Sequence, residues 1–203
     1  MAKRSTGPAL PGLEVGSWFG PVPSWRRRGA DAVEVHAPAR SDRFFDPVSG
    51  RRQADSPVWL APATAPATLV AQVRVGFRDT FDAGVLMAYE RVDAWAKLCF
   101  ERSPVGRPTV VSVVTRGTSD DANGWAVDGD VVWLRLSVLP IGYAFHASSD
   151  GARWDLVRLF RLRSGADRRV GVSVQAPLGE GCSATFAHVA LRPGAVADVR
   201  SGA

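Results

Sequence analysis

The chain has 203 residues, of which 46% are hydrophobic and 22% are charged. This balance is typical of a globular domain and excludes a fibrous or disordered chain. A chain of this length buries roughly 70% of its extended surface on folding, so its core needs neither disulfides nor a structural metal.

The formal net charge is +5, yet the positive charge is almost entirely arginine, because Lys3 and Lys97 are the only lysines. The only run of cations is 26–28, and elsewhere cations alternate with acids, so no nucleic-acid partner is expected. Cys99 and Cys182 are too few and too far apart for a disulfide framework or a thiolate zinc site.

The amino terminus carries charge but lacks the unbroken apolar stretch of a signal peptide. No window approaches eighteen consecutive apolar residues, so no membrane contact is expected. The sequence therefore predicts a cytoplasmic protein.

In chain order, residues 1–30 come first and are rich in Pro and Gly. They hold Trp18, Phe19 and Trp25, and these rings predict an arm that packs on the remaining domain, residues 31–203. From there on, hydrophobic residues recur with period two in short segments. The predicted strands are Ala32–His36, Val58–Leu60, Ala67–Val75, Ala83–Tyr89, Trp95–Glu101, Thr109–Thr115, Val131–Ser137, Gly142–Ser148, Trp154–Phe160, Arg169–Ala176 and Cys182–Leu191.

Turns with suitable chemistry separate several of these strands. Asn123-Gly124, Asp128-Gly129 and Asp150-Gly151 favour the positive φ angles of tight reversals. About a dozen strands cannot form one flat sheet without curling or splitting. The expected fold is all-β, a two-sheet antiparallel β-sandwich.

Alternation along three strands assigns side chains to a core face and an outward face. Predicted to face the core are Ala96, Leu98, Phe100, Val132, Leu134 and Leu136. Predicted to face outward are Trp95, Lys97, Cys99, Glu101, Val110, Ser112, Val114, Arg116, Val131, Trp133 and Arg135.

If these strands share one sheet, its outward face gathers Trp95, Lys97, Glu101, Arg116, Trp133 and Arg135. Aromatic rings among charged hydrogen-bonding groups are typical of a surface that binds a sugar or another small polar ligand. The alternative is structural, because Trp and Arg on a sheet face often stack on each other or on a covering arm.

Motifs for catalysis and metal binding are weak. The pattern G-x-S-x-G is absent, and His36, His146 and His188 lie on separate elements without ligand spacing. A pair of carboxylates for glycoside hydrolysis could come only from different strands, as Glu101 and Asp120. No catalytic residue, metal or cofactor is predicted.

The segment 119–124, followed by Asp130, faintly resembles an oxygen-rich calcium loop. Its first ligand position would be Ser119 and its last the short Asp130. A hairpin turn at Asn123-Gly124 explains the same residues more simply.

Several motifs together resemble a known family. They are Asp82 followed by Ala83-Gly84-Val85-Leu86-Met87, then Trp95-Ala96-Lys97, Ser112-Val113-Val114-Thr115-Arg116-Gly117-Thr118-Ser119-Asp120, Trp133-Leu134-Arg135 and Ser149-Asp150-Gly151-Ala152-Arg153-Trp154. Over roughly residues 25–191, their order and spacing resemble an uncharacterised family named after a yeast protein called regulation of enolase. At 120–125 the chain departs from the usual Ser-Asp-Trp-Ser of that family.

The resemblance implies a jelly roll of the concanavalin A-like lectin and glucanase superfamily with a concave face. It implies no established enzymatic activity and no cofactor. Its shared positions overlap the outward face and add two residues, giving Lys97, Arg116, Ser119, Asp120, Trp133 and Arg135.

The preferred hypothesis is a non-catalytic domain that binds a carbohydrate or another small polar or anionic ligand on the concave face, with a regulatory role in carbon metabolism. The ligand-binding residues would be Trp95, Lys97, Glu101, Arg116, Ser119, Asp120, Trp133 and Arg135. One alternative is a glycoside hydrolase or lyase that uses Glu101 and Asp120, and another is an interaction module for a metabolic enzyme.

Overall fold

The computed structural model describes residues 10–162 and 167–203. These residues form strands, turns and loops without a helix. The strands are β1 (Ser17–Phe19), β2 (Trp25–Arg27), β3 (Ala32–His36), β4 (Arg43–Phe45), β5 (Arg52–Ala54), β6 (Val58–Pro62), β7 (Ala67–Gly76), β8 (Ala83–Arg91), β9 (Ala94–Arg102), β10 (Pro108–Arg116), β11 (Ser119–Ala126), β12 (Val131–Val138), β13 (Tyr143–Ser148), β14 (Asp155–Phe160), β15 (Arg169–Gln175) and β16 (Ser183–Pro193).

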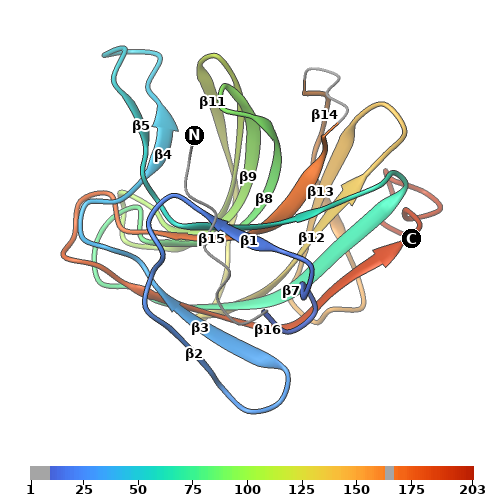
Figure 1. Cartoon of the computed structure of the whole chain (residues 1–203), viewed down its shortest axis with the longest axis horizontal. Helices are drawn as coiled ribbons and strands as arrows, with labels where there is room; N and C mark the ends of the chain where they lie inside the picture. Colours follow the sequence, from blue (N-terminus) through green and yellow to red (C-terminus); the bar gives the residue numbers. More distant parts are fainter. Residues whose placement is uncertain (1–9, 163–166) are drawn as a thin grey trace.

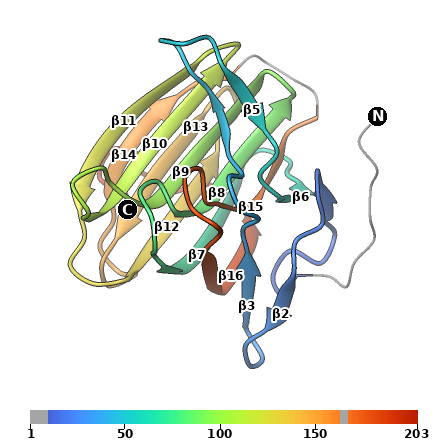
Figure 2. The same cartoon turned by 90° about the vertical axis from the view of Figure 1, so that its left-hand side faces the viewer.

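Two antiparallel seven-stranded sheets make up the sandwich (Figures 1 and 2). The front sheet has the order β1-β6-β15-β8-β9-β10-β11, and the back sheet has the order β14-β13-β12-β7-β16-β3-β2. The hairpin β4–β5 belongs to neither sheet and stands beside the front sheet in Figure 1. The predicted fold class, an all-β two-sheet sandwich, is confirmed.

The main core lies between the two sheets. Leu86 and Phe100 of the front sheet and Leu69, Leu134 and Phe145 of the back sheet have no exposed surface. They come from alternate positions of their strands, because successive side chains of a strand point to opposite faces. Alternation therefore separates this core from two outer faces that remain for other chemistry.

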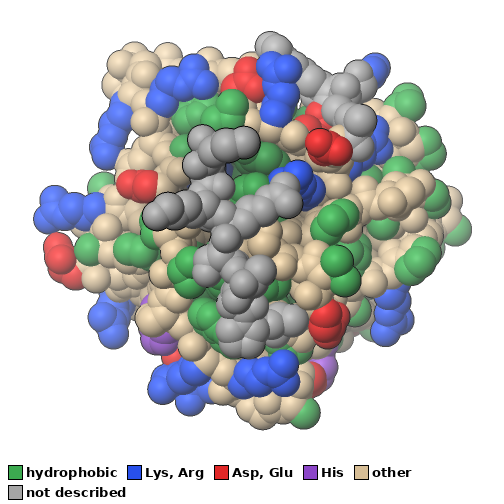
Figure 3. All heavy atoms as spheres, in the orientation of Figure 1, with side chains coloured by type: hydrophobic (Ala, Val, Ile, Leu, Met, Phe, Trp, Pro, Cys, Tyr) green, Lys and Arg blue, Asp and Glu red, His purple; other side chains and the backbone are tan. Residues whose placement is uncertain are grey.

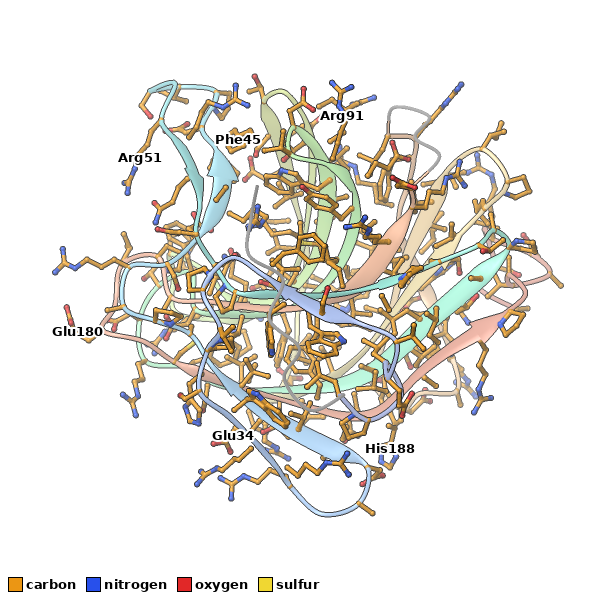
Figure 4. All side chains as sticks on the ribbon, viewed as in Figure 1. Glu34, Phe45, Arg51, Arg91, Glu180 and His188 are labelled. Atoms are coloured by element: carbon orange, nitrogen blue, oxygen red, sulfur yellow. The ribbon has the colours of Figure 1, made fainter. Side chains whose placement is uncertain are left out.

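The front sheet is also covered on its outer face, where a second apolar cluster lies under the hairpin. Phe45 of β4 packs edge-on against Trp95 of β9, with ring centroids 5.6 Å apart, and it points from the hairpin toward the sheet in Figure 4. The Phe45 backbone N–H donates a 2.9 Å hydrogen bond to the Ser119 hydroxyl, whose Oγ lies 2.8 Å from Thr115 Oγ1. These contacts hold the hairpin over the sheet.

Part of the predicted amino-terminal arm is built into both sheets. Strand β1 pairs with β6 at the edge of the front sheet, and β2 pairs with β3 at the edge of the back sheet. Trp18 is buried against Trp59 with ring centroids 5.4 Å apart, and Trp59 Nε1 donates to the Leu13 carbonyl at 3.0 Å. Residues 17–27 thus contribute edge strands, while residues 1–9 of the predicted arm lie outside the described residues.

The turn predicted at Asn123-Gly124 is wrong. Both residues lie within β11, and Asn123 pairs with Val111. The chain instead reverses between β10 and β11 at Gly117, whose φ is +87°. The predicted turns at Asp128-Gly129 and Asp150-Gly151 do occur between strands, and their glycines have φ of +98° and +75°.

The face assigned to β10 is also wrong. Val114 pairs with the core residue Ala96 and packs in the main core, as does Val110. Val111 and Val113 are the residues that face the hairpin side. The sequence alone does not settle this choice, because both faces of β10 are apolar and buried.

No helix in residues 10–162 or 167–203 is long and apolar enough to cross a membrane. On the face seen in Figure 3, Lys and Arg are scattered near the rim among Asp and Glu, without a single basic patch.

A glycine in the front sheet provides a test of this packing. At Gly171 of β15 an added Cβ would lie 1.7 Å from the Trp59 carbonyl oxygen, a backbone atom that cannot rotate away. We expect Gly171→Ala to lower the free energy of unfolding by about 3 kcal/mol or more, measured by urea denaturation.

The matched control is Gly76→Ala at the end of β7. There the added Cβ would lie 3.1 Å from the Ser183 hydroxyl, which can rotate aside. We expect a loss below about 1 kcal/mol. Equal losses in the two variants would contradict the close approach of β15 and β6.

Candidate functional site

A pocket of roughly 300 Å³ opens on the outer face of the front sheet, beside the β4–β5 hairpin. We call it the front pocket. Its volume lies at the lower end of the range for small-molecule sites. It is lined by Asp42, Phe44, Asp46, Phe81, Lys97, Glu101, Val111, Val113, Asp121, Gln175 and Pro177.

Lys97 supplies the buried cation of the front pocket. Its side chain projects from β9 beneath the hairpin, and only 2% of the residue is exposed. Nζ donates a 2.8 Å hydrogen bond to Gln175 Oε1 and lies 3.5 Å from Asp42 Oδ1. Nζ is also 5.9 Å from the ring centroids of both Phe44 and Trp95. These partners satisfy a charge that would be costly to bury alone.

Glu101 lies four residues after Lys97 on β9, so its side chain is on the same face of the strand. The Gln175 amide nitrogen contacts Glu101 Oε2 at 3.5 Å and donates to the Phe81 carbonyl at 3.3 Å. Burial raises the pKa of the Glu101 carboxyl to about 8, the charge of Asp42 adds to this rise, and the charge of Lys97 opposes it. Glu101 is therefore mostly protonated near neutral pH and can donate as well as accept a hydrogen bond.

The rim of the front pocket is acidic and partly apolar. Asp46 and Asp121 are accessible to solvent there, and Asp42, which is partly buried, contacts Lys97. Among the described residues, four carboxyl groups and one cation, Lys97, thus line the pocket. Phe44, Phe81, Val111, Val113 and Pro177 supply the apolar part of the wall.

The structure brings together only some of the predicted site residues. Lys97 and Glu101 line the front pocket, as expected from their shared strand face. Trp95 shares this face but is fully buried beneath Phe45, and Ser119 is buried where it accepts the Phe45 N–H. Trp95 and Ser119 therefore support the hairpin.

Asp120 and Arg116 lie away from the front pocket. Asp120 sits opposite Val114 in β11 and accepts a 3.0 Å hydrogen bond from Arg158 of the back sheet. The neighbouring Asp121 sits opposite Val113 and lines the pocket. Arg116 is exposed at the end of β10, in register with Ala94.

Consequently, Glu101 and Asp120 do not face one cleft, and of the two adjacent aspartates it is Asp121 that shares the pocket with Glu101. The ligand positions of the suggested calcium loop, Ser119, Asp121 and Asn123, lie along the extended strand β11 and not in a loop that wraps around one ion. Within the described part of the chain, no cluster of three or more His, Cys, Asp or Glu could hold a metal ion.

The assumption that Trp133 and Arg135 share a sheet with Lys97 is wrong. Both belong to β12 of the back sheet, on its outer face, so the main core separates them from Lys97. Period two assigns a residue to one face of its own strand, but it does not say which strands form one sheet. The predicted single patch is thus divided between opposite sides of the molecule.

Of the eleven described residues that line the front pocket, nine were not predicted as site residues. Asp42, Phe44 and Asp46 lie in or next to the β4–β5 hairpin and Asp121 lies in β11, and the sequence predicts neither element. Gln175 lies on a predicted strand, where it alternates with the buried Val172 and Val174. Gln175 and Ser173 are polar residues on the same face of an otherwise apolar strand. That pattern is a signal that could have identified Gln175 as a site residue.

The sequence matches the family described as "Protein of unknown function (DUF1349)" over residues 18–194. The chain belongs to this family. None of the curated proteins matches the sequence. The resemblance found in the sequence therefore holds at family level, and the link to enolase stays a prediction.

Solved structures with the same fold include a functionally unknown protein from Saccharomyces cerevisiae, with TM-score 0.83, 23% identity, and 91% of this chain and 99% of that chain covered. A xylan β-1,4-xylosidase from Bacillus halodurans matches with TM-score 0.65 and 11% identity over 78% of this chain, which is 32% of that chain. An alginate lyase from Klebsiella pneumoniae matches with TM-score 0.55 and 12% identity over 87% of this chain and 86% of that chain. At these identities the likeness shows the fold, and the chain spans about a third of the xylosidase.

The raised pKa of Glu101 predicts how stability depends on pH. The unfolded carboxyl titrates near its ordinary value of 4.5, whereas the folded one titrates near 8. Between these values the folded state binds more protons than the unfolded state, so stability falls as pH rises from 4.5 to 8. We expect this slope in urea unfolding to approach about 1.4 kcal/mol per pH unit.

Glu101→Gln should remove this slope, because an amide of the same shape does not titrate. The free energy of unfolding of the variant should match that of the native protein near pH 5 and exceed it near pH 8. A slope that persists unchanged in the variant would assign the titration to another group.

Proposed function

We propose that the front pocket binds a neutral, hydroxyl-rich ligand, a carbohydrate, without catalysing its reaction. The observation that supports this most directly is the polar floor of the pocket, where Lys97, Gln175 and Glu101 contact one another in a buried site that remains open beside the hairpin. Hydroxyl groups both donate and accept hydrogen bonds, so they suit a floor that offers an ammonium, an amide and a protonated carboxyl.

The charge of the front pocket selects against anions. Asp42, Asp46 and Asp121 line a space in which Lys97, the one cation of its described lining, is already paired with Asp42. An anionic ligand would be repelled there, and like charges placed together in a partly buried site are costly. Of the ligand classes expected from the sequence, the neutral carbohydrate fits the front pocket best.

The aromatic groups of the front pocket suit a sugar ring. Phe44 of the hairpin and Phe81 line the wall, and carbohydrates present flat C–H faces that pack on aromatic rings. The fold itself occurs in a xylan β-1,4-xylosidase, which makes neutral xylo-oligosaccharides suitable first probes.

The catalytic alternative of Glu101 with Asp120 receives no support from the geometry, since the Asp120 carboxylate is bound to Arg158 outside the pocket. A binding role needs no second carboxylate at a set distance. It needs only the donors and acceptors that the pocket floor provides.

Two adjacent aspartates provide a sharp test. Asp121→Asn keeps the size of an exposed rim residue but weakens the hydrogen bonds that it accepts from ligand hydroxyls. We expect it to weaken binding of xylotriose or another responsive neutral oligosaccharide by about tenfold, because hydrogen bonds to charged groups contribute about 1.5–3 kcal/mol. Isothermal titration calorimetry measures this affinity.

The matched control is Asp120→Asn, which makes the same chemical change one residue earlier on the opposite face. Its affinity should stay within about twofold of the native value. Equal losses in both variants, or heat of binding absent for every neutral sugar tested, would contradict a carbohydrate site in the front pocket.

A further inference from the structure

A second hollow lies on the outer face of the back sheet, on the far side of the sandwich from the front pocket. It has a volume of roughly 570 Å³. We call it the back groove. Its lining comes from β7, β12, β16, the β13–β14 connection and the segment after β16, and its members that matter here are Val70, Trp133, Arg135, Trp154, His188 and Arg192.

The charge of the back groove is opposite to that of the front pocket. Two arginines and one histidine line it, and its described lining contains no carboxylate. The histidine, His188, sits at the irregularity of β16 with φ of +51°, on the outer side of the sheet in Figure 4. Its Nδ1 lies 2.9 Å from Asp31 Oδ2, so this histidine has an acidic partner outside the groove.

Among the residues that the structure describes, Arg135 has no acidic partner. Only 7% of the residue is exposed, and its guanidinium carbon lies 4.4 Å from the Trp154 ring centroid. Nη2 donates a 2.7 Å hydrogen bond to the Gly202 carbonyl, while the buried Nε has no acceptor among the described residues. Burial lowers the pKa of Arg135 to about 10, so the group still carries its charge at neutral pH.

The guanidinium of Arg135 is buried against an aromatic ring and bonds one neutral carbonyl. Its Nε–H donor has no acceptor among the described residues. Buried charges are ordinarily paired with an opposite charge, and an arginine presents its donors in a fork that matches carboxylate and phosphate oxygens. An oxyanion would supply both the negative charge and the acceptors that Arg135 lacks among the described residues.

The groove also has an apolar body. Trp133 stacks on His188 with ring centroids 5.4 Å apart and an interplanar angle of 16°. The turn at Gly151 lies against the indole so closely that an added Cβ would be 2.9 Å from Trp133 Cε2. These contacts fix the indole as a rigid wall, with Val70 beside it, against which the carbon skeleton of a ligand can pack.

The geometry points to the back groove as a binding site for a small organic oxyanion, whose carboxylate or phosphate pairs with Arg135 and Arg192 and whose body packs beside Trp133. This site is separate from the carbohydrate site proposed for the front pocket. It accounts for the presence of Trp133 and Arg135 on an outer face without requiring them to meet Lys97.

Three probes of similar body test the proposal by isothermal titration calorimetry. Glucuronate carries a carboxylate, glucose 6-phosphate carries a phosphate, and glucose is neutral. In the Asp121→Asn variant, whose front pocket is weakened, we expect at least one anion to bind at least about tenfold more tightly than glucose, with an affinity that falls as salt rises. The stronger anion identifies which oxyanion the groove prefers.

Location is tested with charge reversals at two exposed arginines. Arg192→Glu should weaken anion binding by about tenfold or more, whereas Arg107→Glu, the same change outside the groove, should leave it within about twofold. NMR signals of the His188 ring should shift on titration of the native protein with the anion. Arg135→Met should abolish binding if it folds, but the conclusion does not need it.

Three outcomes would overturn the proposal: equal affinity for glucose and both anions in the Asp121→Asn variant, equal losses in Arg192→Glu and Arg107→Glu, or no detectable anion binding up to about 10 mM. Anion binding that is lost in Asp121→Asn would also overturn it, because that variant alters only the front pocket. Failure of the neutral-sugar experiment leaves this test unaffected, so the two proposals can fail separately.

Discussion

The burial of Lys97 is the constraint on which the outer face of the front sheet depends. An ammonium group with 2% exposure has to be surrounded by acceptors, and here they come from three separate places: Asp42 before the hairpin, Gln175 on β15 and the ring faces of Phe44 and Trp95. The hairpin can cover the sheet only because it brings Asp42 and Phe44 with it. An apolar residue at position 97 would allow the hairpin to close on the sheet as a dry core, whereas the lysine keeps a polar hollow beneath it.

The protonated state of Glu101 follows from the same arrangement. One buried cation cannot neutralise Asp42 and Glu101 together, because each additional buried negative charge loses its hydration. Asp42 holds the ion pair with Lys97, and Glu101, enclosed further inside, keeps its proton. The front pocket therefore offers donors at its floor and negative charge at its rim. That polarity suits hydroxyl groups and opposes anions.

Fold class and most strand positions follow from the sequence, because period-two alternation and Gly turns are local signals. Strand β3 lies where it is predicted, and β7 through β10 differ by one or two residues at their ends. The assignment of faces fails at β10, where Val110 to Val114 are apolar on both sides because the hairpin adds a second cluster. The prediction of a single patch is wrong for a related reason. The neighbours of Lys97 and of Arg135 depend on the strand order of the sheets and on an unpredicted hairpin. Both depend on contacts between residues far apart in the sequence.

Dividing the predicted site residues between two faces changes the net charge that each surface presents to a ligand. A single surface that held Lys97, Glu101, Trp133 and Arg135 would contain both acids and cations. Their charges would offset one another, so the surface would not indicate whether its ligand is neutral or charged. Two packed sheets lie about 10 Å apart, and each pocket lies outside its own sheet, so their charged groups are separated by more than a Debye length of about 8 Å at physiological ionic strength. Neither pocket can neutralise the other through solvent. The front pocket thus keeps its excess of carboxylates and the back groove its excess of cations, and a single sandwich can present two sites that select ligands of different charge.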